Sequence, residues 1–211
     1  MRERISISSY HNSLTKRLSD VILVLFALIL LFPFLIILPV LIKTTSKGRT
    51  IFKQKRVGLN GKVFTLFKFR TMKEGSEKKL ATLSHLNEAD GPVFKIGNDP
   101  RYTKIGNILA KTGIDEIPQF VNILKGDMSL VGPRPLPIYE ANKLTPYQKR
   151  RESVLPGITS SWVIEGSHNL SFKKWMELDL SYVQNASLKE DLIILVKTLK
   201  LILKELYKSA V

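Results

Sequence analysis

The middle of the chain reads Lys111-Thr-Gly-Ile-Asp115-Glu116-Ile-Pro118-Gln-Phe-Val-Asn-Ile-Leu-Lys-Gly126, with two adjacent carboxylates near its start. This pattern predicts a helix over residues 116–125, with Asp115 as its N-cap and Gly126 as its C-terminal stop. Pro118 would lie in the first turn, where its missing N–H costs little. Helix N-termini favour ionised carboxylates and bind phosphate. An isolated aspartate there is usually only a cap, so the rest of the chain decides its function.

The composition narrows the class of protein and of partner. The chain has 211 residues, enough for one domain with a core and a short anchor. Its formal net charge of +15 indicates an anionic partner: nucleic acid, a phosphorylated substrate or a lipid surface. The absence of cysteine excludes disulfides, thiolate zinc sites and cysteine nucleophiles. The sequence contains no dinucleotide-binding glycine motif, Walker A loop or zinc-protease motif.

Residues 21–42 form an apolar run without a charged residue, long enough to cross a bilayer. It is too long for a signal peptide, and no cleavage site follows it. Pro33 and Pro39 each remove a helical hydrogen bond within the run. Basic residues stand on both sides of it: Lys16, Arg17, Lys43, Lys47, Arg49, Lys53, Lys55 and Arg56. Such flanks belong in the cytoplasm, which favours a re-entrant helical hairpin broken at Pro33 over a kinked spanning helix.

Alternating residues on both sides of Asn60-Gly61 predict a β-hairpin over residues 51–57 and 62–70. Phe64 and Leu66 are expected on one face of it, together with Lys68.

Residues 188–207 have the pattern of an amphipathic helix, with a leucine-rich stripe opposite a row of lysines. This helix either packs on the domain or lies at a membrane interface. The predicted fold is α+β, mainly helical with a small hairpin. Its expected parts are a flexible N-terminus (1–14), a re-entrant membrane helix (15–46), a catalytic domain (47–187) and the C-terminal helix (188–211).

Acidic residues in so basic a chain are the candidates for chemistry. Asp115 and Glu116, surrounded by lysine and arginine, suit a Mg²⁺-bound diphosphate. An aspartate can also be a nucleophile that forms an acyl phosphate. Successive helical residues are about 100° apart, so both carboxylates could line one cleft in different roles.

Several motifs follow one another along the chain: Lys16-Arg17-x-x-Asp20, Lys68-Phe-Arg70-Thr-Met72, Asp99-Pro-Arg101, Asp115-Glu116-Ile-Pro118-Gln119, Lys125-Gly-Asp127-Met-Ser-Leu-Val-Gly-Pro-Arg134-Pro135, Pro156-Gly-Ile-Thr159 and Glu177-Leu-Asp-Leu. Together they resemble the bacterial sugar transferase family, the monotopic polyprenyl-phosphate phosphoglycosyl transferases. The resemblance runs from about residue 15 to about residue 200.

The resemblance implies a catalytic dyad of Asp115 and Glu116, which would also hold Mg²⁺. Asp115 would attack the β-phosphate of a UDP-sugar and release UMP, and polyprenyl phosphate would then take the phosphosugar from the enzyme. Arg134, held between prolines, would bind phosphate as a preorganised donor, with Arg70 and Arg101 as weaker candidates for the same task.

The resemblance also suggests further substrate contacts: Lys68, Asp127, Pro133, Pro135 and Trp162. It places the protein on the cytoplasmic face of the bacterial inner membrane, as a monotopic enzyme that initiates a lipid-linked glycan for lipopolysaccharide, capsule or another surface polysaccharide. No nucleic acid is expected as a partner, and a homodimer is left open.

Two departures from the family pattern affect these expectations. Phe32 replaces the usual serine before Pro33, so the membrane break needs another cap. The loop over residues 160–168 differs from the family, with Ser167 in place of a usual arginine. A catalytically weak scaffold in a glycan assembly complex is therefore one alternative. A membrane-tethered polyanion-binding protein is the other, although no nucleic-acid motif supports it.

Overall fold

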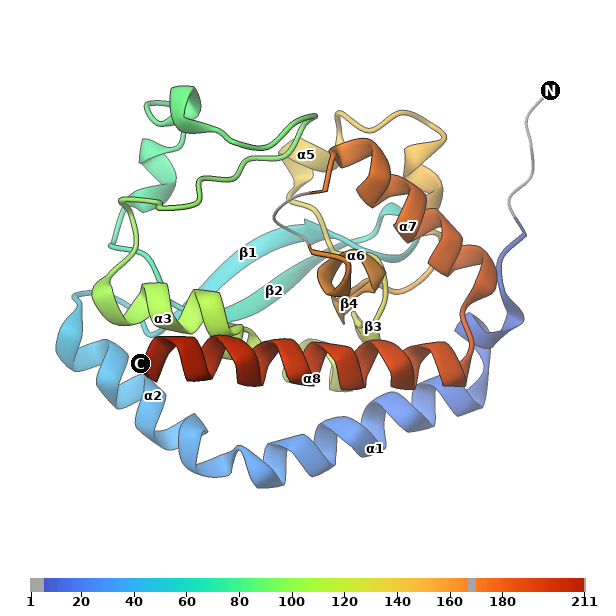
Figure 1. Ribbon diagram of the computed structural model, residues 1–211, viewed down its shortest axis with the longest axis horizontal. Helices are drawn as coiled ribbons and strands as arrows, with labels where there is room; N and C mark the ends of the chain where they lie inside the picture. The colour runs from blue at the N-terminus through green and yellow to red at the C-terminus, as the bar shows by residue number, and fades with distance from the viewer. Residues whose placement is uncertain (1–5, 167–169, 211) are drawn as a thin grey trace.

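The computed structural model describes residues 6–166 and 170–210, which form a mainly helical fold with two small sheets (Figure 1). The described helices and strands are α1 (Leu14–Leu30), α2 (Phe32–Thr45), β1 (Ile51–Val57), β2 (Val63–Phe69), α3 (Lys104–Thr112), α4 (Phe120–Lys125), β3 (Ser129–Val131), α5 (Ile138–Ala141), β4 (Gly157–Thr159), α6 (Ser161–Ile164), α7 (Phe172–Asn185) and α8 (Leu188–Ala210). Short 3-10 helices cover Ser9–Asn12, Leu59–Gly61, Ser76–Lys79, Ser84–Leu86, Ile114–Gln119 and Gln148–Ser153. The predicted mainly helical class with a small antiparallel hairpin is confirmed, and the parallel β3–β4 pair is an addition.

The apolar run forms two helices that meet at a sharp bend. No single described helix is long and apolar enough to cross a membrane, whereas α1 and α2 together meet that test as a pair bent by 65°. The break falls at Leu31, because Pro33 lies in the first turn of α2, where a missing N–H is tolerated. The Leu31 N–H bonds to the carbonyls of Ala27 and Ile29, and the Leu31 carbonyl accepts from Phe34 N–H at 3.0 Å. Backbone groups therefore satisfy the break without a serine hydroxyl.

The predicted hairpin is present, with β1 and β2 paired antiparallel from Ile51 and Phe69 to Val57 and Val63. Asn60 and Gly61 both adopt the left-handed backbone that this turn requires, with φ of 52° and 77°. Phe64 and Leu66 are buried on one face, as expected. Phe69, on the opposite face, is buried as well, because α2 and α3 cover the end of β2.

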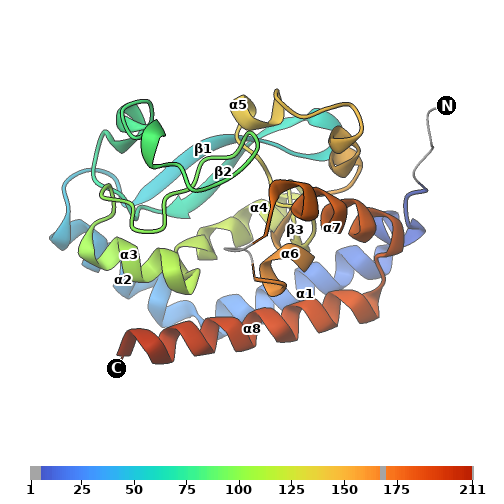
Figure 2. The ribbon, with the colours of Figure 1, turned by 45° about the horizontal axis from the view of Figure 1, so that its top comes forward.

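The helices α1, α2 and α8 line one side of the molecule, with the hairpin and the remaining helices on the other (Figures 1 and 2). The main core fills the space between these layers: Val24, Phe64, Leu66, Ile123, Met128, Leu130, Val131, Tyr182, Ala186 and Ile194. Only part of α8 contributes to it. Ile194 is buried, and Thr198 shares a 2.6 Å hydroxyl hydrogen bond with Thr159 of β4.

The outward surface of these three helices is apolar. Its exposed residues are Ile22, Leu25, Phe26, Ile29, Leu30, Phe32, Phe34, Ile36, Ile37, Val40, Leu192, Ile193, Val196, Leu199 and Leu203. On α8, most of the predicted leucine-rich stripe therefore faces outward, while a different face of the helix packs on the core. A soluble monomer rarely exposes so many neighbouring apolar side chains.

A buried polar network joins the start of α1 to α8 and β3. Lys16 Nζ lies 2.6 Å from Asp191 Oδ2 and donates to the Val131 carbonyl at 3.1 Å. Asp191 also accepts from the Tyr182 hydroxyl at 2.6 Å, and Asp20 accepts from Leu130 N–H at 3.1 Å. Lys16 is only 4% exposed, so it holds the fold together and is not a free cation beside the membrane.

Arg17 is also used by the fold. Its guanidinium donates to the carbonyls of Ile123 and Leu124 at 2.6 and 2.9 Å, which caps the end of α4. The basic residues that support a cytoplasmic location of both ends are therefore mainly those at and after the end of α2.

Candidate active site

Asp115 and Glu116 lie in a 3-10 helix, Ile114–Gln119, that leads directly into α4. The predicted N-cap at Asp115 is wrong: Gly113, in a left-handed backbone with φ of 73°, precedes the helix, and no side chain caps it. The helix starts two residues earlier, at Ile114, because Gly113 both ends α3 and turns the chain. The Asp115 carboxylate is therefore not used as a cap. Gly126, with φ of 84°, ends α4 as predicted.

Strand β2 brings Lys68 to the two carboxylates. Lys68 Nζ lies 2.5 Å from Glu116 Oε1 and 3.4 Å from Asp115 Oδ2. Arg134 Nη1 approaches Glu116 Oε1 from another direction, at 3.6 Å. Asp115 is 5% exposed, whereas a third of the Arg134 side chain is exposed at the mouth of the site. A lysine thus bridges the two carboxylates, with an arginine in front of them.

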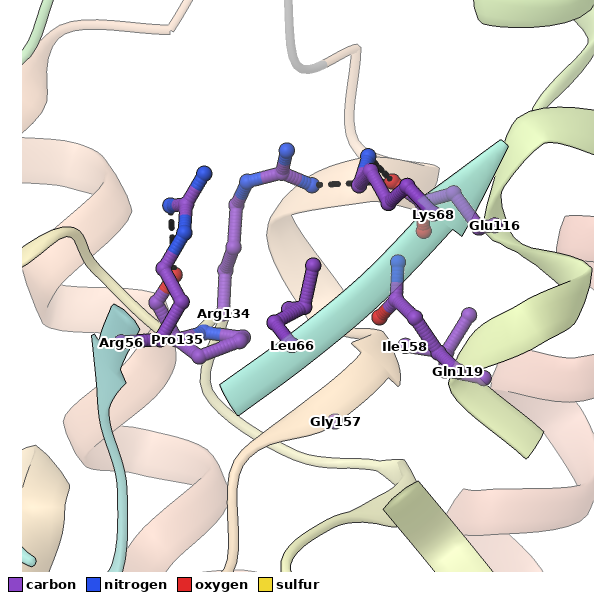
Figure 3. A pocket seen from close by; sticks show the side chains of 9 residues that line it. All are labelled: Arg56, Leu66, Lys68, Glu116, Gln119, Arg134, Pro135, Gly157 and Ile158. Atoms are coloured by element: carbon purple, nitrogen blue, oxygen red, sulfur yellow. Dashed lines mark hydrogen bonds and ion pairs between the residues drawn. The ribbon is translucent and has the colours of Figure 1, made fainter. Parts of the chain in front are cut away.

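These groups border a small, partly open pocket (Figure 3). Its lining residues are Arg56, Leu66, Lys68, Glu116, Gln119, Arg134, Pro135, Gly157 and Ile158. Among the sequence-predicted residues, Lys68, Glu116, Arg134 and Pro135 line it, and Asp115 adjoins it through Lys68.

The surroundings of the two carboxylates shift their pKa values in opposite directions. Burial raises the pKa of Asp115 above its usual range, although the charge of Lys68 opposes this shift. Burial also acts to raise the pKa of Glu116, but Lys68 and Arg134 outweigh it, and the pKa of Glu116 is lowered. Glu116 is thus kept as a stable anion, while Asp115 is the more basic of the two carboxylates.

Arg134 is positioned by more than its flanking prolines. Its backbone carbonyl accepts from Arg151 Nη2 at 2.7 Å, and Arg151 is fixed by a buried ion pair with Asp179 at 2.6 Å. The Pro133 carbonyl accepts from Gly157 N–H at 3.0 Å, next to the β3–β4 pair. The arginine therefore projects from a rigid segment, as a preorganised donor requires.

Other predicted residues have partners outside the pocket. Arg70 donates to the carbonyl and hydroxyl of Ser46, at the end of α2. Arg101 forms a buried ion pair with Asp99 at 2.5 Å. Asp127 accepts from the Asn122 side chain at 3.4 Å. Their roles toward phosphate or substrate stay predictions.

Trp162 lies nearer to the site. The Cζ atom of Arg134 is 6.0 Å from the centroid of the Trp162 ring, which stacks in turn on Trp175 at 4.5 Å. The altered positions Ser167 and His168 lie outside the described residues.

Sequence reasoning missed Arg56 and Gln119 as site residues. Arg56 pairs with Phe64 in the hairpin register, so it shares a face with Lys68, and the alternation could have revealed it. Gln119 is 2% exposed and lies one helical turn after Glu116, facing the pocket (Figure 3).

The donor set fits a magnesium ion that shares its ligands with a substrate. Within residues 6–166 and 170–210, no cluster of three or more acidic, histidine or cysteine side chains could hold a metal alone. Mg²⁺ is usually held by one or two carboxylates, together with phosphate oxygens and water. Asp115 and Glu116 supply two carboxylates, and the placement of Lys68 Nζ between them shows that the position accepts a cation.

Two carboxylates within a cationic pocket define a site suited to phosphate groups. A family model described as "Bacterial sugar transferase" matches residues 11–205, nearly the whole chain. The chain belongs to the bacterial sugar transferase family. The predicted membership is confirmed, and with it the class of the protein, a transferase.

Curated relatives agree with this assignment. The chain is 46% identical to the galactosyl transferase CpsE of Streptococcus agalactiae over 157 residues, which are 74% of this chain and 35% of CpsE. It is 37% identical over 193 residues to the exopolysaccharide production protein ExoY of Sinorhizobium fredii, covering 88% of this chain and 84% of ExoY. It is 34% identical over 212 residues to the undecaprenyl-phosphate galactose phosphotransferase of Salmonella typhimurium, covering 97% of this chain and 44% of that protein. The chain thus spans less than half of two of these relatives and most of the third.

Proposed function

We propose that the chain transfers a sugar-1-phosphate from a UDP-sugar to polyprenyl phosphate, and so starts a lipid-linked glycan for a surface polysaccharide. The observation that carries this proposal is the Asp115–Glu116 pair, bridged by Lys68 and faced by Arg134 in one pocket. A paired carboxylate provides a nucleophile and a second anion, and the cations suit a diphosphate. Membership of the family and the names of the relatives point to the same reaction class.

The reaction proceeds in two displacements at one phosphorus atom. The Asp115 carboxylate attacks the β-phosphorus of the UDP-sugar, and the bond from that phosphorus to the bridging oxygen breaks, so that UMP leaves. The sugar phosphate is then held on the Asp115 carboxylate as an acyl phosphate. An oxygen of polyprenyl phosphate attacks the same phosphorus, the acyl phosphate bond breaks, and the carboxylate is restored. The lipid product is a polyprenyl diphosphosugar.

Each neighbouring residue has a distinct task. Lys68 holds Asp115 in place and favours its ionised form, because the positive charge of Lys68 opposes the effect of burial on the pKa of Asp115. Arg134 binds the transferred phosphate, on which negative charge builds up during the displacement. Glu116 orients Lys68 and Arg134, and it would hold Mg²⁺ together with Asp115. When bound, Mg²⁺ would supply Lewis-acid stabilisation of the diphosphate.

The exposed apolar surface of α1, α2 and α8 supports a monotopic membrane attachment at the cytoplasmic face of the bacterial inner membrane. In this arrangement α1 and α2 dip into one leaflet and α8 lies along the interface, with its lysines toward lipid headgroups. The bend of 65° at Leu31 supports this arrangement, in which the chain would leave the leaflet on the side from which it entered. Cysteines introduced at Asn12 and at Lys47 are therefore expected to react with an impermeant reagent from the same membrane face. Labelling from opposite faces would refute the re-entrant arrangement.

Release of UMP tests the reaction. Purified protein in lipid nanodiscs is expected to release UMP from a UDP-sugar and to require Mg²⁺ for it. UDP-galactose is the first donor to try, because two of the relatives are named for galactose transfer. Without polyprenyl phosphate, UMP release should stop at about one equivalent per enzyme, with the label of a radioactive sugar retained on the protein.

Two conservative variants separate the roles of the carboxylates. Asp115→Asn should retain no label and Glu116→Gln should be slowed, since each removes a charge with little change in shape. Wild-type turnover in Asp115→Asn would rule out the nucleophile assignment. Absence of UMP release from every UDP-sugar tested would favour the catalytically weak scaffold.

A further inference from the structure

Arg56 occupies the active-site pocket on the opposite side of Arg134 from the carboxylates. It stands at the penultimate position of β1, and its side chain lines the pocket together with Lys68, Glu116 and Arg134. Figure 3 shows Arg56 at one end of this row, Glu116 and Lys68 at the other, and Arg134 between them. A ligand that spans the pocket from the carboxylates would therefore meet Arg134 first and Arg56 second.

The backbone fixes the two arginines close together. Arg56 Nη1 donates to the Pro135 carbonyl at 2.9 Å, so the segment that carries Arg134 also holds the guanidinium of Arg56. The backbone of β1 is tied there too, because Val57 N–H donates to the Leu136 carbonyl at 3.0 Å. The Arg56 guanidinium therefore cannot leave the segment that carries Arg134 without breaking its bond to Pro135.

Within residues 6–166 and 170–210, the Arg56 guanidinium keeps an unsatisfied donor. Its Nε is buried and finds no hydrogen-bond partner among these residues, although a buried donor normally has one. Burial and the positive charge of Arg134 lower the pKa of Arg56 to about 10. The charge of Glu140 opposes this shift, while burial raises the pKa of the Glu140 carboxyl itself.

The charges around the pocket are likewise unbalanced in favour of an anion. Arg56, Lys68 and Arg134 face two carboxylates, and Lys68 is already bonded to both of them. Like charges held close together in a partly buried site repel each other until an anion binds between them. Phosphate oxygens match the fork of a guanidinium group, and a diphosphate offers one phosphate to each arginine.

We propose that Arg56 is a second phosphate-binding residue, which contacts the phosphate that leaves with the nucleotide while Arg134 contacts the phosphate that is transferred. This assignment rests on the proposed function and follows from the order of the residues across the pocket. Arg56 then acts in the first displacement, where UMP is the leaving group. In the second displacement the acceptor phosphate attacks from the side opposite Asp115, the position that UMP has vacated, so Arg56 contacts that phosphate as well.

The experiment measures UMP binding and the two displacements separately, with the full chain in lipid nanodiscs. Variants Arg56→Gln and Arg56→Lys are compared with Lys55→Gln, which removes the same charge from the neighbouring, exposed residue of β1. Calorimetry gives the Kd for UMP. Rapid quench gives the rate of UMP release without acceptor, and polyprenyl phosphate added to the isolated labelled enzyme gives the rate of the second displacement.

Arg56→Gln is expected to weaken UMP binding and to slow UMP release by roughly 10- to 100-fold, the cost of one hydrogen bond to a charged group. The second displacement should slow as well, because the acceptor phosphate attacks from the position that UMP has vacated. Arg56→Lys should recover part of the loss, and Lys55→Gln should behave as wild type.

Other outcomes overturn the assignment. Unchanged UMP binding in Arg56→Gln, or no UMP binding in the wild type, refutes it. Slower displacements with unchanged UMP binding would show that Arg56 only supports Arg134 through Pro135. Failure of the wild type to use any UDP-sugar would refute the proposed function, and the UMP affinities would still decide the role of Arg56.

Discussion

Replacement of Lys16 by methionine should destabilise the protein strongly, although Lys16 lies far from the pocket. Its ammonium group is 2.6 Å from Asp191, 3.6 Å from Asp20 and 3.1 Å from the Val131 carbonyl, and the side chain is almost fully buried. Removing it leaves Asp191 as a buried carboxylate that keeps only its two tyrosine hydroxyl donors, from Tyr182 and Tyr10.

The expected loss follows from the burial of this network. Breaking a buried ion pair by removing one partner costs about 3–5 kcal/mol. The two tyrosine donors that remain on Asp191 favour the lower half of that range, so about 3–4 kcal/mol of unfolding free energy should be lost. For a chain of this size the corresponding fall in Tm is about 6–16 °C. Because β3 leads to Arg134, activity should decline in parallel with the loss of folded protein.

Urea unfolding in a fixed detergent, followed by the fluorescence of Trp162 and Trp175, measures this change. Lys104→Met, at an exposed position on α3, is the matched control and should change stability by less than about 0.5 kcal/mol. Adding Asp191→Asn to Lys16→Met should recover part of the loss, since the unpaired charge is then removed. A loss below about 1 kcal/mol in Lys16→Met, as for a surface ion pair, would show that this network does not stabilise the fold.

Three further predictions concern the site and its supports. Lys68→Gln should shift the acid limb of the kcat/KM profile for UMP release to higher pH. Asp115 must be ionised to attack, and loss of the Lys68 charge raises the pKa of Asp115. An unchanged acid limb would show that Lys68 does not control the ionisation of the nucleophile. Gly157→Ala should lower activity and cost about 1–3 kcal/mol in urea unfolding, because the added Cβ would collide with the backbone of β3 beside the pocket. Gly106→Ala should lose at least as much unfolding free energy, since the added Cβ would collide with the carbonyl of Thr71. Wild-type stability in either alanine variant would contradict this packing.

Local features were predictable from the sequence because the interactions that form them span only a few residues. The hairpin turn at Asn60-Gly61 needs two left-handed residues, and few residues other than asparagine and glycine adopt that backbone readily. Gly126 ends α4 for the same reason. The start of the catalytic helix was misplaced by two residues, since a glycine cap competes with an aspartate cap and only the packing of α3 decides between them.

The site was only partly predictable, because its members come from distant segments. Asp115 and Glu116 are neighbours in sequence, so their association was evident from the start. Their closeness to Lys68 depends on how β2 packs against the 3-10 helix, and Arg56 reaches the pocket only through the register of the hairpin. The assignment of Lys16 as a membrane flank missed its role because a buried ion pair cannot be distinguished by sequence from an exposed cation.

The sequence by itself determined the family, the mainly helical class, the hairpin and the carboxylate pair, all of which depend on local spacing and motif order. The tertiary structure alone decided which cations face that pair, which residues close the break at Leu31, and which face of α8 is left apolar and exposed. The physical reason is the range of the interactions. Turns and helices form from hydrogen bonds within about four residues, whereas burial, pKa shifts and ion pairs depend on segments that meet only when the chain is folded.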